Sequence, residues 1–262
     1  MDEIKTIKLI DHSRRRFIGT AAMTIASFAI STKASAGATS GETNKAMRSM
    51  TSATQNSFGA LEQINAGVLS IGFAELGPAD GAPVLLLHGW PYDIHCYVDV
   101  APLLAAKGYR VIVPYLRGYG TTRFLSKETT RNAQQSALGV DTIALMDALG
   151  IEKAIIGGCD WGARTANIVA ALWPERCKAM ASISGYLIGS QQLGRMPLPP
   201  GAELQWWYQY YFATDRGREG YAKYTRDFAR LIWQLASPKW AFDDATFDRS
   251  AAALRTRTTS TS

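Results

Sequence analysis

Positions 157–166 read Gly-Gly-Cys-Asp-Trp-Gly-Ala-Arg-Thr-Ala, and this stretch decides the fold. It follows a strand-like apolar run at 154–156 and opens a helix-like run that ends near Trp173. The order is therefore strand, tight turn and helix, with Asp160 at the centre of a Gly-x-Asp-x-Gly turn. A carboxylate held at such a turn is a candidate nucleophile, because it can attack a saturated carbon and form an ester.

The turn needs small residues because it forces its central residue into a strained, positive-φ conformation. Gly158 and Gly162 lie two positions before and after Asp160, and Ala163 lets the helix approach the strand. The helix N-terminus favours negative charge, so we expect Asp160 to stay ionised. The alternative is a glycine-rich turn in which Asp160 only caps the helix.

Two further motifs accompany the turn. An apolar strand at 84–87 leads into His88-Gly89-Trp90-Pro91, and a second strand leads into Arg-Gly-Tyr-Gly at 117–120. In this order and at this spacing, the three motifs resemble those of epoxide hydrolases and haloalkane dehalogenases, which belong to the α/β-hydrolase superfamily. The resemblance runs from about 61 to about 250. It implies an α/β-hydrolase fold, a mostly parallel sheet flanked by helices with a helical cap.

The resemblance also implies roles for individual residues. Asp160 is the nucleophile of an epoxide-opening reaction that passes through an alkyl-enzyme ester. The backbone N–H groups of Trp90 and Trp161 form an oxyanion hole for the later hydrolysis of that ester. His88, in its motif with Gly89, is structural and organises the loop that carries the first donor. In the cap, Tyr208 donates a hydrogen bond to the ring oxygen.

The expected ligand is a small molecule, an epoxide or an organohalide. This chemistry uses neither cofactor nor metal, and Cys96, Cys159 and Cys177 lack the spacing of metal ligands. We interpret Cys159 as a packing residue, because the glycine spacing centres on Asp160. Two other functions stay open: a haloalkane or haloacid dehalogenase with the same nucleophile and a halide-binding Trp161 N–H, and a catalytically inactive hydrolase-fold binding protein.

The resemblance implies that a His oriented by an acid activates water after the cap. The chain has three histidines, His12, His88 and His95, and none stands at that position; His95 is a weak substitute. The segment 251–262 shows no apolar periodicity. We therefore expect a truncated or frameshifted product that lacks the last strands and the His–acid pair. Its sheet should have an exposed edge, and its catalytic turnover should be impaired.

The N-terminus reads as an export signal. A twin-arginine pattern, Ser-Arg-Arg-Arg-Phe-Ile at 13–18, precedes a mildly apolar run at 19–31 and Ala-Ser-Ala at 34–36. This pattern predicts a Tat signal peptide that is removed after Ala36, and hence a periplasmic or secreted protein with no membrane attachment after cleavage. Outside residues 1–36 the chain has 22 basic and 19 acidic residues, which gives a net charge of +3. This charge does not indicate a nucleic-acid surface.

The predicted organisation has five segments. They are the signal peptide (1–36), a flexible lead-in (37–60), the hydrolase core (61–186), the helical cap (187–250) and an aberrant disordered tail (251–262). Within the core, strands are expected at 83–87, 109–114, 153–156 and 178–184. Helices are expected at about 93–107, 134–149 and 161–172.

Overall fold

The computed structural model describes residues 57–185 and 190–254. The predicted signal peptide, the lead-in up to residue 56, and residues 255–262 of the predicted tail lie outside the described residues.

Seven strands form a single sheet within these residues, in the order β1-β2-β4-β3-β6-β7, with β5 paired to β2. Strand β2 pairs antiparallel with both β1 and β4. From β4 onward, through β3, β6 and β7, neighbouring strands are parallel. The strands are β1 (Glu62–Ala66), β2 (Leu69–Leu76), β3 (Ala82–Leu87), β4 (Tyr109–Pro114), β5 (Arg123–Phe124), β6 (Ala154–Cys159) and β7 (Cys177–Ile183). This arrangement confirms the predicted fold class, and each predicted core strand is present.

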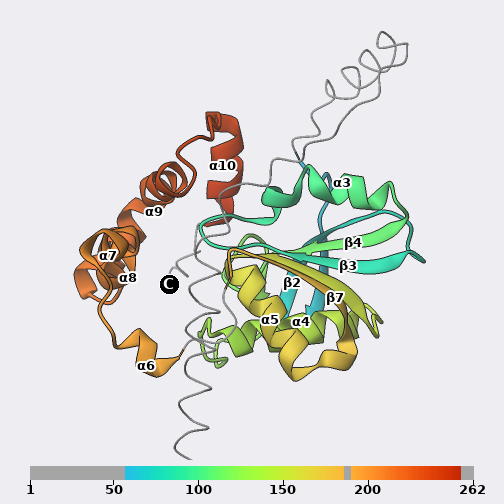
Figure 1. Cartoon of the computed structure of the whole chain (residues 1–262). Helices are drawn as coiled ribbons and strands as arrows, with labels where there is room; N and C mark the ends of the chain where they lie inside the picture. Colours follow the sequence, from blue (N-terminus) through green and yellow to red (C-terminus); the bar gives the residue numbers. More distant parts are fainter. Residues whose placement is uncertain (1–56, 186–189, 255–262) are drawn as a thin grey trace, which may run out of the picture. The chain divides into compact units, whose positions relative to one another are not determined.

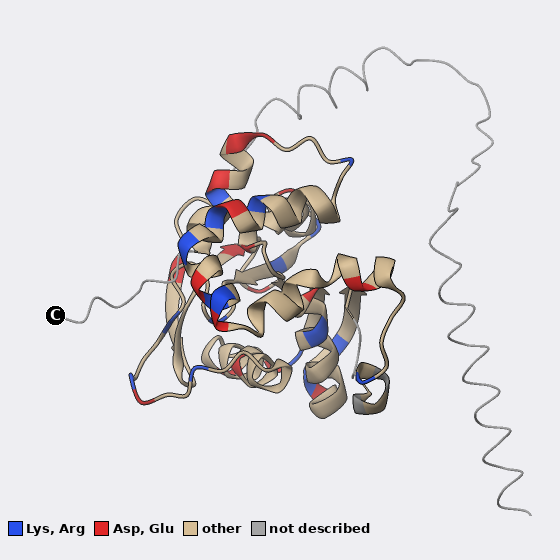
Figure 2. Ribbon diagram, turned by 90° about the vertical axis from the view of Figure 1, so that its left-hand side faces the viewer, with Lys and Arg blue, Asp and Glu red and all other residues tan. Residues whose placement is uncertain are grey.

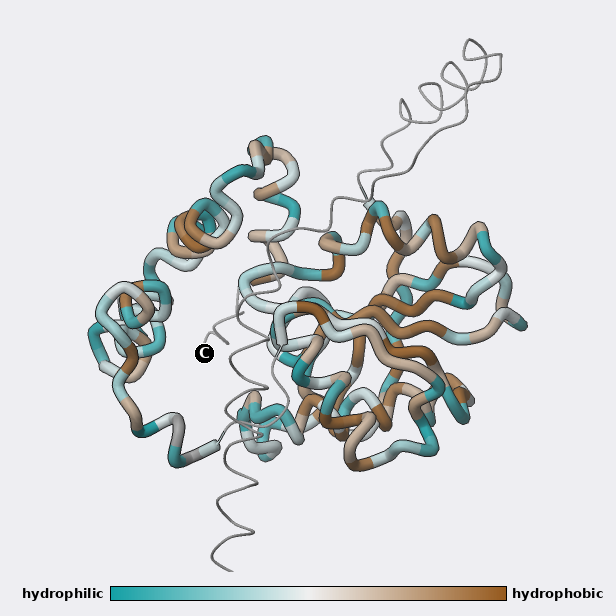
Figure 3. Tube along the Cα trace, viewed as in Figure 1, coloured by the Kyte–Doolittle hydropathy of each residue, from teal (hydrophilic) through white to brown (hydrophobic). Residues whose placement is uncertain are grey.

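Helices cover both faces of the sheet (Figure 1). Helix α3 (Val100–Ala105) lies on one face, while α4 (Gln135–Ala148) and α5 (Trp161–Leu172) lie on the other. The strands between them are apolar on both sides, as parallel strands buried under helices must be. Figure 3 shows this hydrophobic stretch along the central strands, where Leu85 and Ile112 are fully buried.

The single helix expected over about 93–107 is divided in two. A 3₁₀ turn, η1 (Ile94–Tyr97), precedes α3. Asp93 starts η1 by accepting a hydrogen bond from the His95 backbone N–H at 3.1 Å. Pro102 lacks an N–H and therefore fits only in the first turn of a helix, so the helix restarts at Val100.

The cap consists of helices in the described residues. They are α6 (Gln191–Gly194), α7 (Pro200–Gln205), α8 (Trp207–Phe212), α9 (Asp215–Ala236) and α10 (Asp244–Ala253). Helix α10 continues through Ala253, which is buried, so the boundary predicted at 250 lies three residues too early. Its last turn is held because Ala253 O accepts a hydrogen bond from Gly120 N–H at 2.9 Å.

Strand β7 ends the sheet on one side and pairs only with β6 in the described part of the chain. All of its residues after Cys177 are exposed, including Met180 and Ile183. Its only charged residue is Lys178. The edge opposite to the antiparallel strands is therefore open.

Charges are mixed across the described residues. Lys and Arg alternate with Asp and Glu along the ribbon of the cap helices (Figure 2). Among the helices that the structure describes, none is both long and apolar enough to cross a bilayer.

Candidate active site

The turn between β6 and α5 places Asp160 in an uncommon backbone conformation. Its φ is 55° and its ψ is −116°. The neighbouring strand fixes this conformation, because Asp160 N–H donates to Ile183 O at 3.0 Å. On the other side, Asp160 O accepts from Arg164 N–H at 3.0 Å and so begins the hydrogen bonding of α5. Among the described residues, Ser184 is the other non-glycine residue with a positive φ. Such a conformation is energetically costly and persists only where the surrounding structure enforces it.

The two glycines of the turn are required by close backbone approach. A Cβ on Gly158 would lie 2.2 Å from Gly162 O, and a Cβ on Gly162 would lie 1.8 Å from Leu87 O. Ala163 is fully buried between the helix and the sheet. The spacing in the sequence thus reflects contacts in which one extra carbon would displace the backbone.

The loop after β3 lies directly against the turn. Strands β3 and β6 pair in parallel with Leu87 opposite Gly158, which brings their C-terminal ends together. A Cβ on Gly89 would lie 2.5 Å from Asp160 Cβ. The backbone N–H of Trp90 donates no hydrogen bond to the residues that the structure describes. Within the described part of the chain, the Trp90 N–H is thus a donor without a partner, one residue from the contact between Gly89 and Asp160.

His88 has both ring nitrogens engaged. Its Nε2 accepts from Leu116 N–H at 3.1 Å, and its Nδ1 lies 3.1 Å from Gly89 O, to which it donates. The residue is fully buried, and this burial lowers the pKa of His88. A neutral ring with one nitrogen accepting and the other donating has no free nitrogen to act as a base.

The Asp160 carboxyl is only partly compensated. Burial raises the pKa of Asp160 to about 6, against the opposing effects of Arg164 and of the Trp161 backbone N–H. Oδ2 is buried and has no hydrogen-bond partner among the described residues. The sequence predicted that the helix N-terminus would keep Asp160 ionised, but desolvation has the larger effect and raises the pKa of Asp160. The carboxylate is still the main form at neutral pH, because this pKa is about 6.

Aromatic side chains of the cap cover the loop after β3. The Trp90 and Tyr208 rings lie 5.2 Å apart between centroids, and Phe212 packs on Trp90 at 5.7 Å. Tyr208 therefore contacts Trp90, and Trp90 belongs to the loop that packs against Asp160. Tyr221 also contacts Trp90, because its hydroxyl accepts a hydrogen bond from Trp90 Nε1 at 3.1 Å.

Tyr221 was not among the residues predicted for the site, although the sequence contains a signal for it. Tyr221, Thr225, Phe228 and Ile232 recur at helical spacing, and Phe228 and Ile232 are buried. This inward face of α9 marks Tyr221 as a residue that points toward the core.

His95, the weak substitute base, lies elsewhere in the network. Its Nδ1 is 2.7 Å from Oδ2 of the fully buried Asp93, and its ring packs 5.7 Å from that of Phe58. The structure therefore places His95 with Asp93 and not with the Asp160 carboxyl.

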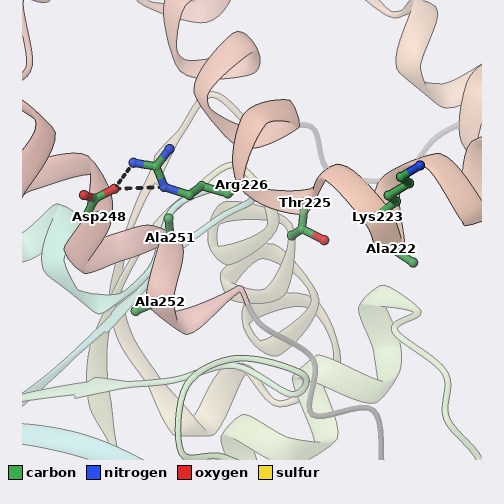
Figure 4. Close-up of a pocket in the computed structure, with 7 residues that line it drawn as sticks. All are labelled: Ala222, Lys223, Thr225, Arg226, Asp248, Ala251 and Ala252. Atoms are coloured by element: carbon green, nitrogen blue, oxygen red, sulfur yellow. Dashed lines mark hydrogen bonds and ion pairs between the residues drawn. The ribbon is translucent and has the colours of Figure 1, made fainter.

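Two cavities flank the cap. One of about 260 Å³ is lined at one end by Arg164, which acts on Asp160, and at the other by residues of the cap, among them Glu203, Trp206 and Tyr210. Another of about 630 Å³ lies between α9 and α10, where Arg226 pairs with Asp248 (Figure 4). The first cavity is the one related to Asp160, through Arg164, although Asp160 itself is not among the residues that line it. No group of three or more metal-ligating side chains occurs in the described ranges.

Comparison with known proteins agrees with this geometry. Residues 82–241 match the model of a family described as alpha/beta hydrolase fold. A crystal structure of a "putative epoxide hydrolase" from Klebsiella pneumoniae is 64% identical, with a TM-score of 0.74, over 76% of this chain and 66% of that one.

Curated relatives match a shorter region. Epoxide hydrolase B of Mycobacterium tuberculosis is 35% identical over 150 residues, which is 52% of this chain and 41% of the relative. A haloalkane dehalogenase of Mycobacterium marinum is 34% identical over 131 residues, 49% of this chain and 42% of the relative. The chain thus spans about two fifths of the length of these relatives. With a family match over more than half of its residues, this chain belongs to the α/β-hydrolase fold family, among relatives of the epoxide-hydrolase type.

Proposed function

We propose that Asp160 is the nucleophile of an epoxide-opening reaction. One carboxylate oxygen attacks an oxirane carbon, the carbon–oxygen bond of the ring breaks, and the product is a β-hydroxyalkyl ester of Asp160. The observation that carries this proposal is the buried Oδ2, which has no hydrogen-bond partner in residues 57–185 and 190–254, on a residue held at φ 55°. The names of the relatives support the choice of epoxide as the electrophile.

Tyr208 is proposed as the acid of this step. The ring oxygen gains negative charge as the bond breaks, and a phenol that donates a hydrogen bond stabilises the developing alkoxide. Tyr208 is supported by its contact with Trp90, whose neighbour Gly89 adjoins Asp160.

The second step is hydrolysis of the ester. Water adds to the ester carbonyl, and the backbone N–H groups of Trp90 and Trp161 are proposed to hold the oxyanion. The step needs a base. The two histidines of the described part have other partners, His88 in its loop and His95 on Asp93. We therefore propose that this chain stops at the ester and does not turn over.

Intact-mass spectrometry after incubation with styrene oxide tests the proposal. We expect one added epoxide mass per chain, located on Asp160 by peptide mapping, and no accumulation of diol beyond one equivalent. The matched control is Asp160→Asn, which keeps the shape of the side chain and removes its nucleophilic charge. Absence of an adduct on the unmodified chain contradicts the proposed epoxide-opening reaction. Many equivalents of diol contradict the proposed arrest at the ester.

An organohalide is the second candidate substrate, because one relative of similar identity is named a haloalkane dehalogenase. Here Asp160 displaces halide and forms the same kind of ester, with the Trp161 N–H proposed to bind the leaving halide. Release of one equivalent of bromide from a bromoalkane, without an adduct from styrene oxide, favours this reaction. Reversible binding of both compounds without an adduct favours an inactive hydrolase-fold binding protein.

We also propose export through the Tat pathway, on the basis of the twin-arginine pattern at 13–18. A reporter fused after residue 36 should reach the periplasm, and changing Arg14 and Arg15 to Lys should retain it in the cytoplasm. Export of the changed fusion at the original level would contradict this proposal.

A further inference from the structure

We propose that Ser250, on the last helix of the cap, acts with Asp93 as a positioning pair for the Trp90 N–H donor of the oxyanion hole. This inference rests on the proposed function, because it concerns the second step of that reaction. It assigns a role to the cap beyond covering the substrate: the cap sets the geometry of the loop that follows β3.

The pair is buried and closely bonded. Asp93 is fully buried, and Ser250 is 3% exposed. Ser250 Oγ donates to Asp93 Oδ1 at 2.7 Å, across a sequence separation of 157 residues. The same carboxylate accepts from the His95 backbone at 3.1 Å and contacts the His95 ring at 2.7 Å. Hydrogen bonds to a buried carboxylate are among the strong ones, so this contact fixes α10 to the loop.

The cap holds each of the three preceding residues of the loop as well. Trp90 Nε1 donates to the Tyr221 hydroxyl at 3.1 Å. Trp233 Nε1 donates to Pro91 O at 3.0 Å, and the Trp233 ring stacks on Tyr92 at 4.9 Å. Helix α9 thus contacts positions 90–92, and α10 contacts position 93. Four consecutive residues are held from the same side.

The position of this loop determines where the donor points. Tyr92 N–H bonds to Gly89 O at 3.2 Å, so residues 89–92 form one tight turn that moves as a unit with Asp93. Gly89 packs against Asp160 at one end of the turn, and Asp93, which Ser250 holds, follows its other end. An oxyanion donor must lie within about 2.7–3.1 Å of the developing charge, and a displacement of about 1 Å costs a large part of its effect.

Cleavage of the trapped ester by hydroxylamine isolates this step without a protein base. The nitrogen adds to the ester carbonyl, whose electron pair moves onto the oxygen facing the two N–H donors. Collapse of the intermediate then breaks the bond between the acyl carbon and the ester oxygen, and the nitrogen loses a proton. The alkyl group leaves as a diol, after taking a proton, and Asp160 remains as a hydroxamate. The two enzyme species differ in mass, so mass spectrometry follows the rate directly.

The experiment compares the unmodified chain with Ser250→Ala after both have been alkylated by styrene oxide. We expect the two alkylation rates to agree within about twofold, because the Trp90 donor that Ser250 positions acts only on the ester. Hydroxylamine cleavage should be about tenfold slower in Ser250→Ala, a fraction of the loss caused by deleting an oxyanion donor. Hydrogen–deuterium exchange of the peptide that contains Trp90 should become faster.

Asp248→Asn is the matched control. Asp248 lies on the same helix and pairs with Arg226 of α9 on the exposed side of the cap (Figure 4). This variant loosens the link between α9 and α10 without touching Asp93, and it should cleave like the unmodified chain. Equal cleavage rates in Ser250→Ala and the unmodified chain, or equal slowing in both variants, overturn the inference. If the unmodified chain forms no adduct, the proposed function fails, and the exchange measurement still tests whether Ser250 holds the loop.

Discussion

Asp93 and Asp160 follow neighbouring parallel strands, β3 and β6, yet their surroundings differ sharply. Asp93 is fully buried and receives hydrogen bonds from Ser250, the His95 backbone and the His95 ring. Asp160 has a buried Oδ2 without a partner among the described residues, and its backbone lies at φ 55°. Asp160 is half-buried as a residue, although its Oδ2 is buried. What separates the structural carboxylate from the proposed nucleophile is whether the fold satisfies its buried oxygens.

The largest effect is expected when each carboxylate is replaced by its amide. Asp160→Asn should abolish the styrene oxide adduct, a loss of at least about a thousandfold in rate, because an amide is a poor nucleophile. Asp93→Asn should retain alkylation within about tenfold, since Asp93 does not touch the electrophile. Intact-mass kinetics measure both. Equal losses in the two variants would remove the distinction between the sites.

A second test concerns stability. Asp93→Ala removes the acceptor for three hydrogen bonds and leaves buried donors without a partner. We expect the free energy of unfolding to fall by about 3–5 kcal/mol, as when one partner of a buried charged pair is lost. Urea denaturation measures this change. A loss under about 1 kcal/mol would indicate that the Asp93 network contributes little.

The pH dependence of alkylation sharpens the description of Asp160. Burial raises its pKa to about 6, and only the carboxylate attacks. The rate should therefore rise about tenfold per pH unit below pH 6 and level off above it, for a total of about 100-fold between pH 4 and 8. Initial rates of adduct formation across this range provide the profile. A plateau that already begins at pH 4 would contradict the shifted pKa.

The smallest effect is a gain in stability from Asp160→Asn. The folded chain binds the Asp160 proton more tightly than the unfolded chain does, because the folded pKa is about 6 and the ordinary value is 3.8. The contribution is fully present below about pH 3.8 and is lost as the pH rises through 6. At pH 8 the amide should therefore raise the free energy of unfolding by about 1–3 kcal/mol, with a gain near zero at pH 4. Urea titrations at the two pH values measure the difference.

The strained turn at Asp160 was predictable from sequence, and the hydrogen-bonded network around Asp93 was not. Asp160 lies in a local pattern, because Gly158 and Gly162 are needed for contacts within a few residues. The partner of Asp93 is 157 residues away, and only the packing of α10 brings Ser250 to it. A turn is determined by residues that are close in the sequence, so it can be predicted locally. A long-range contact depends on how the whole chain folds.

Two other features show the same limit. The break between η1 and α3 depends on the Asp93 cap and Pro102, which an apolar pattern over 93–107 does not reveal. The raised pKa of Asp160 depends on desolvation, which requires knowing what covers the turn. Helical spacing on α9, by contrast, was available in the sequence and marks Tyr221.

Strand β7 has a consequence for handling the protein, because no further strand pairs with its outer side among the described residues. An edge of this kind is a template on which a strand of another molecule can add, and Lys178 is the only charge on β7 that opposes such growth. Self-association should consequently increase with concentration and with salt that screens this lysine. Dilute preparations of low ionic strength are the conditions in which the chemistry of Asp160 is best measured.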